Sequence, residues 1–552
     1  MTRRGLGLLF VATWALYLAV GLYLAVGINF FIGDSLARVQ AAQSVLFSRD
    51  PHLSAIGFIF TPLTTLVQLP MTAFTPLWAP ITTDAISAAV MSSAFMAGSV
   101  VQISGIGRDR GMPAWITIAV TVCYTVNPMI VFYGANGMSE APYLFFLCWA
   151  ARRIARWVDT DDVHELVIAG IALALGYLTR YDGGAASLAA TVFVAVVAFR
   201  RRGSDKRLSR SVIDATIVVF PSAVAFLVWA ATSWLITGDL IAQTSSQYGN
   251  SSIIEQSGGT GSDTASSALV FSLTELAILA PLMPLTLAMV LVVRSRRHRF
   301  YPVLAVSIPF LAVLAFQILS YSRGTTFGFL RFYITVIPLS AIITLLVIPA
   351  TRRVPYRRLG HYAEMPPVRA RPRRPRLYNT LGLVAVLGMV VAIPSALYGM
   401  GSTKNAPQEF ALVTLATPHA DNTTQRYLDA QRVARTFSTE KTIAHYLDGL
   451  HLPDGSVICD TVYGFAVVVR STRPAQFVIP SDEDFTDILN NPKEHGVQYI
   501  LAVPRTGRGQ SDAVNLRYPT MYDNGAQIAS MILEAPNDGA DQPTWRLYEV
   551  TR

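Results

Sequence analysis

The sequence predicts a polytopic α-helical membrane protein with about eleven transmembrane helices and a small α/β domain at its C-terminal end. Of the 552 residues, 52% are hydrophobic and only 14% are charged, whereas soluble globular proteins carry about 25% charged residues. Residues 1–401 form one apolar run after another, while residues 402–552 have the composition of a soluble domain. Charge divides at the same place, with 31 Lys/Arg against 17 Asp/Glu before residue 402 and 13 against 18 after it.

Charge and cysteine content limit the kinds of partner and of metal site that this chain can have. In a soluble protein a net charge of +9 would suggest nucleic acid, but here the excess lies between hydrophobic segments, so the lipid bilayer explains it and no nucleic-acid partner is expected. The three cysteines are Cys123 and Cys148 in apolar segments and Cys459 alone in the C-terminal part. The C-terminal part therefore has neither a disulfide framework nor a cysteine metal site.

Eleven segments are apolar enough to cross a bilayer, which takes about 20 helical residues. The first is too long for the core of a signal peptide and has no clear cleavage site, so it predicts a retained helix. The segments are residues 5–31, 84–106, 113–133, 138–157, 163–180, 184–200, 211–236, 269–293, 300–321, 328–350 and 377–400.

Charge in the connections orients these helices, because Lys and Arg stay on the cytoplasmic side. With the N-terminus in the cytoplasm, the cytoplasmic connections hold 26 Lys/Arg and the opposite connections hold 5. Eleven spans in the inner (cytoplasmic) membrane then place residues 402–552 outside the cytoplasm. Residues 351–376 become a cytoplasmic linker, and residues 1–401 form the membrane domain.

The first outer loop, residues 32–83, is long. Apolar residues recur at helical spacing over its first part, which predicts an amphipathic helix lying in the membrane interface. Asp34 begins that helix, where a carboxylate either caps backbone N–H groups or acts as a base at the mouth of a cavity. Residues 52–70 are apolar with two prolines, and they predict a second interfacial helix or a re-entrant segment.

Four acids lie close to outer membrane ends: Asp34, Asp50, Glu140 and Asp182. An ionisable group at membrane depth costs roughly 2.5–3.5 kcal/mol on insertion scales, so it usually has a purpose. The alternative for each is a solvated interfacial carboxylate. Glu140 could instead interact with a helix dipole in the first turn of its helix, and Asp182 could pair with Arg180.

Few cations accompany these acids on the outer side. Arg180, Arg323 and Arg331 lie at or near helix ends, and Arg331 stands among aromatic residues. Such an arginine either snorkels toward water or grips an anionic lipid head group, since the guanidinium matches phosphate oxygens in a fork.

Four segments stand out together with the topology: Gly33–Arg38, His52–Phe58, Tyr133–Glu140 and Leu178–Asp182. In these features the chain resembles the GT-C glycosyltransferases, in particular the protein-mannosyltransferase-like branch (family 39 type) and its bacterial, often actinobacterial, members. The resemblance covers the first seven helices best.

This resemblance implies an inverting hexosyl or pentosyl transferase that moves a sugar from a polyprenyl-phosphate donor to a glycan, glycolipid or protein hydroxyl on the outer face. Asp34 matches the family's general base, and Glu140 matches its second acidic position. A positioned carboxylate can take the proton of an attacking hydroxyl, and cations stabilise a leaving phosphate. The predicted phosphate-binding residues are Arg331, Arg323 and Arg180, and the other predicted substrate-binding residues are Asp50, His52, Asp182 and Tyr333.

No cofactor is expected, and a metal-free reaction is predicted. Some relatives have paired acids in the first loop, but here Ser35 and Leu36 follow Asp34. A divalent cation takes several oxygen ligands, although Asp50 or Glu140 could join such a site.

Two other function classes stay open. A transporter or lipid flippase of the cell-envelope pathway predicts internal repeats and polar residues at mid-helix depth, whereas the acids here cluster at outer ends. A structural or assembly protein would use the C-terminal part to recruit partners.

The C-terminal part alternates predicted strands and helices, which is typical of a small α/β domain. Residues 465–470 could be helix or strand, and the acidic run over residues 482–487 predicts a solvated helix start. Helices are expected at about 429–450 and 483–489, and strands at 455–460, 474–479, 497–503 and 545–550.

Overall fold

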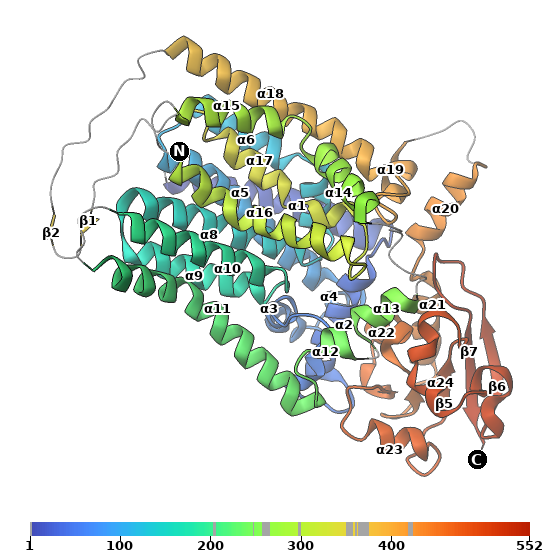
Figure 1. The fold of residues 1–552 in the computed structure, drawn as a ribbon. Coiled ribbons are helices and arrows are strands. Elements are labelled where there is room, and N and C mark those ends of the chain that lie inside the picture. Colours follow the sequence, from blue (N-terminus) through green and yellow to red (C-terminus); the bar gives the residue numbers. More distant parts are fainter. Residues whose placement is uncertain are drawn as a thin grey trace.

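The computed structural model describes residues 3–201, 206–246, 248–256, 265–295, 300–348, 357–358, 361–362, 375–417 and 423–551. A helical bundle fills most of the molecule, and a small domain with a β-sheet lies at one end of it (Figure 1). Of the predicted linker 351–376, the antiparallel pair β1 (Arg357–Arg358) and β2 (His361–Tyr362) and the start of α18 are described. The rest of that linker lies outside the described residues.

All eleven predicted spans are helical. Within the described residues, six helices are long and apolar enough to cross a membrane, or up to eight spans if each of two bent pairs is one span. The six are α1 (Arg3–Leu22, continued by the π-helical η1, Tyr23–Gly27), α5 (Ile86–Asp109), α10 (Gly183–Arg200), α11 (Arg207–Thr237), α16 (Tyr301–Ser322) and α18 (Pro375–Met400).

The other predicted spans are broken, short or polar. Pro128 at the start of α7 has no backbone N–H, so the chain bends there. The bent pairs are α6 (Ala114–Thr125) with α7 (Pro128–Ala135), at 59°, and α14 (Ala265–Leu279) with α15 (Met283–Ser295), at 78°. The remaining segments are α8 (Glu140–Thr160), which carries charges in its second half, α9 (Val163–Tyr177), and η3 (Leu330–Tyr333) with α17 (Val336–Thr344). The chain is a multi-pass membrane protein.

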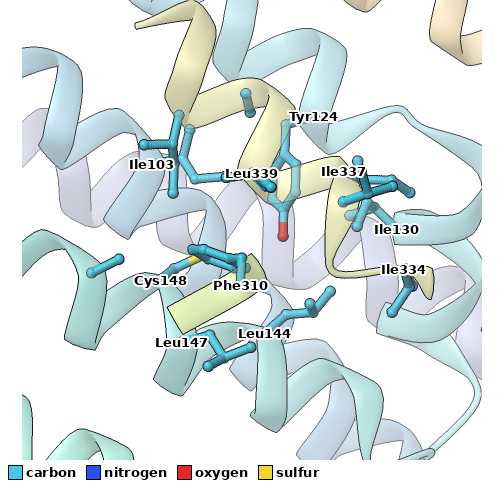
Figure 2. Packing of buried hydrophobic residues seen from close by; sticks show 14 of the residues in the cluster. Ile103, Tyr124, Ile130, Leu144, Leu147, Cys148, Phe310, Ile334, Ile337 and Leu339 are labelled. Atoms are coloured by element: carbon cyan, nitrogen blue, oxygen red, sulfur yellow. The ribbon is translucent and has the colours of Figure 1, made fainter. Parts of the chain in front are cut away.

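Packing of the bundle is dense. Ile103 of α5, Tyr124 of α6, Leu144 of α8, Phe310 of α16 and Leu339 of α17 meet in one core (Figure 2). All five are buried. The rigid bundle formed in this way holds the ends of its helices, and the loops between them, in fixed positions.

Two of the predicted cytoplasmic connections are tied together at one end of the bundle. The Nε atom of Arg152 in α8 lies 2.7 Å from a carboxylate oxygen of Asp109, the last residue of α5. Arg153 reaches Glu165 of α9 at 3.0 Å. These pairs agree with a single sidedness for the connections after α5 and α8.

The first loop forms a 3-10 turn and three helices: α2 (Gly33–Phe47), η2 (Leu53–Ile56), α3 (Leu63–Thr72) and α4 (Pro80–Thr83). The predicted helix at Asp34 is present, but it does not lie free in an interface. It contacts both α3 and α22 (Thr461–Arg470) of the C-terminal domain, and two thirds of its residues are buried. The amphipathic pattern arises because most of its surface packs on protein rather than on lipid.

The C-terminal domain has a five-stranded sheet in the order β4-β3-β5-β7-β6. Strands β3, β4 and β5 are parallel, while β7 is antiparallel to β5 and to β6. The strands are β3 (Val457–Ile458), β4 (Phe477–Val478), β5 (Tyr499–Ala502), β6 (Ala529–Ala535) and β7 (Trp545–Val550).

The helices from residue 438 onward cover this sheet, whereas Phe410, Ala411 and Ala430 of the two earlier helices belong to the core of the bundle. The predicted helix at 429–450 is two helices, and the ambiguous segment 465–470 is helical. Strand β6 was not predicted, because at the sheet edge most of its residues are partly or fully exposed. The helices are α19 (Phe410–Ala416), α20 (Gln425–Ala434), α21 (Ser438–Gly449), α22 (Thr461–Arg470), α23 (Phe485–Asn490), α24 (Ala513–Arg517) and α25 (Met521–Asn524), with short turns η4 (Pro474–Gln476), η5 (Gly507–Ser511) and η6 (Gly525–Gln527). The short helices α12 (Ala242–Ser245) and α13 (Asn250–Gln256) follow α11 and reach this domain.

Candidate active site

Asp34 lies in the first turn of α2, facing an arginine from a distant part of the chain. Its Oδ2 atom is 3.5 Å from Nη2 of Arg331. Within the described part of the chain, neither Ile32, the residue before the helix, nor the side chain of Asp34 makes a capping hydrogen bond to a backbone N–H group. Because 40% of that side chain is exposed, the carboxylate is open to solvent on one side and faces a cation on the other.

Arg331 belongs to η3, the 3-10 turn that leads into α17. Its side chain is only 8% exposed, so it does not snorkel. Nη1 donates to Oε1 of Gln408 at 3.2 Å, and the guanidinium lies 5.1 and 5.3 Å from the ring centres of Phe329 and Phe332. Its Nε atom is buried without a hydrogen-bond partner. The aromatic neighbours predicted from sequence therefore hold the arginine in place while one N–H group stays unused.

Glu140 and Asp182 share a second arginine. Arg180 donates from Nη1 to Glu140 Oε1 at 3.1 Å and from Nε to both carboxylate oxygens of Asp182 at 3.3 Å. The predicted pairing of Arg180 with Asp182 is present, and Glu140 is added to it. Glu140 is almost wholly buried, and its other oxygen has no hydrogen-bond partner. It begins α8, so the favourable interaction with the helix dipole also applies.

Sequence reasoning missed three members of this cluster. The hydroxyl of Tyr133, at the end of α7, donates to Glu409, which directly precedes α19. Arg38, one turn after Asp34, donates to the Asp34 backbone carbonyl at 3.0 Å and lies 4.3 Å from the ring centre of Phe60. Tyr133 is the first residue of the segment Tyr133–Glu140, one of the four segments that carry the family resemblance, and this position could have pointed to it. Glu409 had none, because it stands in a polar segment.

The cluster combines four carboxylates with three guanidinium groups. Arg331 feels the charges of Asp34, Glu140 and Glu409, and Arg38 feels those of Asp34, Glu140 and the other two arginines. Buried charged groups are normally satisfied by partners, yet the Nε atoms of Arg331 and Arg38 and one oxygen of Glu140 are not. An anion with several acceptor oxygens would suit the arginine N–H groups, and a hydroxyl would suit the carboxylates.

Four other predicted site residues lie elsewhere. Asp50 accepts the backbone N–H of Glu483 in the C-terminal domain at 3.0 Å, and the His52 ring nitrogen Nδ1 is 2.7 Å from the Asp50 carbonyl. Tyr333 shares a 2.7 Å hydrogen bond with Ser272 of α14. Arg323, which directly follows α16, is exposed. Among the described residues, no hydrogen bond or ion pair joins any of these four to Asp34, Glu140, Arg180 or Arg331.

The acidic run of the C-terminal domain lies at the start of helix α23, as predicted, and Glu483, Asp484 and Asp487 are exposed. Asp482 is the exception. Asp482 is buried, and its Oδ2 atom lies 3.2 Å from Nε of Arg49, next to Asp50. Asp484 pairs with the same arginine. These two ion pairs were not predicted, because a charge run in sequence does not reveal an opposite charge 433 positions away.

In the described part of the chain, no three residues among His, Cys, Asp and Glu come together in a way that could hold a metal ion. The metal-free reaction stays a prediction.

Comparison with known proteins gives both a sequence match and a structural match. Residues 73–229 match the family model described as dolichyl-phosphate-mannose-protein mannosyltransferase. No curated protein sequence matches the chain.

Among solved structures, two crystal structures of ArnT from Cupriavidus metallidurans are similar over 99% of this chain and 98% of theirs, with a TM-score of 0.54. One, bound to undecaprenyl phosphate, is 14% identical to this chain, and the other, in the apo state, is 13% identical. At such low identity the likeness concerns the fold. The chain thus has the ArnT fold, with a protein-mannosyltransferase sequence signature in its helical bundle, and the resemblance to the GT-C glycosyltransferases is confirmed.

Proposed function

We propose that this protein is a glycosyltransferase that moves a sugar from a polyprenyl-phosphate donor to an acceptor hydroxyl at the outer face of the cytoplasmic membrane. The observation that carries the proposal is the pairing of Asp34 with Arg331: a half-exposed carboxylate beside a buried arginine that has an unused N–H group. One group is suited to accept a proton, and the other to hold a phosphate.

In the proposed reaction the acceptor oxygen attacks the anomeric carbon of the donor sugar. The bond between that carbon and the phosphate oxygen breaks, and the sugar inverts its configuration. Asp34 takes the hydroxyl proton as the new bond forms, because a neutral hydroxyl is a poor nucleophile. Arg331 balances the charge that grows on the leaving phosphate, a type of stabilisation often worth several kcal/mol.

Glu140 and Asp182 have a supporting role in this proposal. Through Arg180 they fix a second guanidinium beside the first, with Glu140 held in the first turn of α8. A preorganised cation costs no reorganisation when charge develops. The mixed cluster of acids and arginines also suits a ligand that carries both hydroxyls and a phosphate.

The lipid carrier is supported by two findings. The cluster is built from the ends of membrane helices and the loops that join them, where a prenyl chain could remain in lipid while its head group reaches the site. The ArnT structure that shares this fold binds undecaprenyl phosphate. The sidedness rests on the distribution of Lys and Arg in the sequence.

The direct test is Asp34→Asn in the full-length protein, reconstituted in lipid nanodiscs. A panel of labelled polyprenyl-phosphate hexoses and pentoses would be supplied, and release of polyprenyl phosphate measured. We expect turnover to fall by about 10²–10⁴-fold, while binding of undecaprenyl phosphate stays within about twofold, since Arg331 is retained.

Asp239→Asn is the matched control, because Asp239 follows α11 and has no part in the cluster. Its turnover should equal that of the unchanged protein. Unchanged turnover in Asp34→Asn, with some donor of the panel used by the unchanged protein, would remove Asp34 as the base.

A further inference from the structure

Arg470, the last residue of α22, is a fully buried arginine in the C-terminal domain that reaches into the membrane part. Its Nη2 donates to Oδ1 of Asn29 at 3.0 Å. Its Nη1 donates to the backbone carbonyl of Thr83 and to Oδ1 of Asp84, the latter at 3.3 Å. The guanidinium also lies 4.1 Å from the ring centre of Phe31. One side chain thus connects two segments that are about fifty residues apart in sequence.

Those two segments are the two ends of the first loop. Asn29 lies where α1 and η1 give way to α2, and Asp84 lies between α4 and α5. Each end contains a non-glycine residue with a left-handed backbone, Asn29 at φ 53° and Ala85 at φ 50°. Such a backbone conformation is unfavourable for a non-glycine residue and persists only where its surroundings hold it. The contacts of Arg470 are part of those surroundings.

The far end of α2 has its own contacts with the C-terminal domain. Arg49, two residues beyond the helix, pairs with Asp482 at 3.2 Å and with Asp484. The Asp50 carboxylate accepts the backbone N–H of Glu483 at 3.0 Å. The helix that begins at Asp34 is therefore tethered close to both of its ends.

An apolar contact lies between these two tethers. Leu36 and Val39 of α2 belong to one buried cluster with Phe465, Ala466 and Val469 of α22. The cluster excludes water along the helix, which makes the tether bonds stronger than they would be at a surface. The first half of helix α2 thus packs on α22, while the far end is tied to residues 482–484.

We infer that the C-terminal domain positions the general base, and that Arg470 is the positioning residue through which it does so. The inference rests on the proposed function, because it takes Asp34 as the base. Arg470 itself touches neither Asp34 nor Arg331; it holds Asn29 and Phe31, which come three to five residues before Asp34, against the start of α5. Movement of α2 along its axis would carry Asp34 away from Arg331.

Stability alone does not explain a buried arginine at this place. Taking a guanidinium out of water is costly, and apolar residues of similar volume are often as stabilising as a buried ion pair. Three acceptors on two chain segments fix a distance and an angle, which apolar packing defines less sharply. Reactions that depend on such geometry lose about 100-fold in rate when a catalytic group moves by about 1 Å.

The first experiment measures the tether itself. Hydrogen exchange of the full-length protein in nanodiscs would be followed by mass spectrometry for Arg470→Gln, with Arg517→Gln as the matched control. Arg517 is exposed and bonds to Asn490 within its own domain. We expect amides of residues 29–47 and 83–88 to exchange about tenfold faster in Arg470→Gln only. Unchanged exchange there would overturn the inference.

The second experiment measures the consequence for the reaction, with the same labelled donors and with undecaprenyl phosphate as the binding probe. We expect kcat of Arg470→Gln to fall about 10–100-fold, with probe affinity and KM within about twofold because Arg331 is in place. Arg470→Lys keeps the positive charge and one donor nitrogen, and it should recover part of kcat. Faster exchange with an unchanged kcat would contradict the positioning role.

Two further outcomes keep the tests separate. If Arg470→Gln fails to accumulate in membranes, Asp84→Asn removes the charged partner of Arg470 and is measured in the same way, with the same expected and contrary results. If Asp34→Asn keeps full turnover, the proposed base is wrong whatever the exchange data show, whereas a normal exchange pattern in both tether variants refutes the positioning role even if Asp34 is the base.

Discussion

Two buried arginines, Arg331 near the helix ends and Arg470 at the domain interface, serve as a comparison within one molecule. Both have a guanidinium largely removed from solvent and an aromatic ring beside it, and in both the Nε atom has no partner. They differ in their terminal nitrogens. Those of Arg470 bond to three acceptors in two segments, while those of Arg331 reach one amide and, at 3.5 Å, one carboxylate.

The carboxylates opposite them differ as well. Asp84 has 19% of its side chain exposed and is shared by Arg470 and Lys441, whereas Asp34 has 40% exposed and faces Arg331 across a long contact. An arginine whose two terminal nitrogens are both well paired, such as Arg470, holds parts of the protein together. An arginine with a loose partner retains bonding capacity for a ligand, and burial makes each such bond worth more than it would be in water. Burial alone therefore does not distinguish a structural arginine from a functional one. The number of hydrogen-bond acceptors around the guanidinium does.

The largest effect is expected from a change of Arg331, which tests whether this arginine binds a ligand whereas Arg470 does not. Arg331→Gln should lower affinity for undecaprenyl phosphate and turnover by about 100-fold, because a charge-assisted bond to phosphate is lost in a buried site. Arg323→Gln is the control, since this exposed arginine was predicted to bind phosphate but has no contact with the cluster among the described residues. Lipid binding and turnover would be measured in nanodiscs. Equal losses in both variants would mean that binding depends on the overall positive charge of this side of the protein and not on Arg331 in particular.

A smaller effect is expected from Glu140→Gln. The amide oxygen can still accept from Arg180, but the charge that holds this guanidinium is lost, so we expect turnover to fall about tenfold. Asp182 keeps its own contacts with Arg180, and probe affinity should change less than turnover. A loss of turnover as large as that of Asp34→Asn would instead assign Glu140 a direct part in proton transfer. An unchanged turnover would mean that Glu140 has only a structural role.

The smallest effect concerns the second tether of α2. Burial raises the pKa of Asp482 to about 6, although Arg49 acts in the opposite direction. The folded protein therefore binds this proton more tightly than the unfolded chain, and the contribution of Asp482 to stability falls as pH rises from about 4 to 6. Asp482→Asn should raise the apparent melting temperature at pH 7.5 by about 2–4 °C and have less effect at pH 4.5.

Thermal unfolding of the full-length protein, followed by tryptophan fluorescence at both pH values, checks this. Asp487→Asn is the control, because 67% of the Asp487 side chain is exposed. A lower melting temperature for Asp482→Asn at pH 7.5 would mean that the ion pair with Arg49 outweighs the cost of burying the carboxylate. The contact of Arg49 with Asp482 would then stabilise the folded protein.

Part of the candidate site could be predicted from sequence, for a definite reason. Asp34, Glu140, Arg180 and Arg331 each stand at the end of an apolar run, where a charged residue is unusual and helix ends lie at similar depth. Asp50 and His52 looked equivalent on the same grounds, yet they contact the C-terminal domain. The sequence thus reveals how deep in the membrane a charged residue lies, but it does not reveal the lateral position of that residue within the helical bundle.

The residues that sequence missed share the opposite property. Glu409 stands in a polar segment and Arg470 at the end of a segment that fitted either helix or strand. Neither is unusual where it stands in the sequence. Their importance comes from partners in other segments: Tyr133 for Glu409, and Asn29, Thr83 and Asp84 for Arg470.

By itself the sequence determined that this is a multi-pass membrane protein with a small α/β domain, where its helical segments lie, and which few polar residues stand at their ends. Hydrophobicity and charge act residue by residue and add up along the chain, so a linear reading captures them. The meeting of Asp34 with Arg331 and the hold of Arg470 on both ends of the first loop were decided only by the tertiary structure. Such contacts depend on how distant helices pack against one another, and side-chain interlocking sets that geometry rather than any local property of the chain.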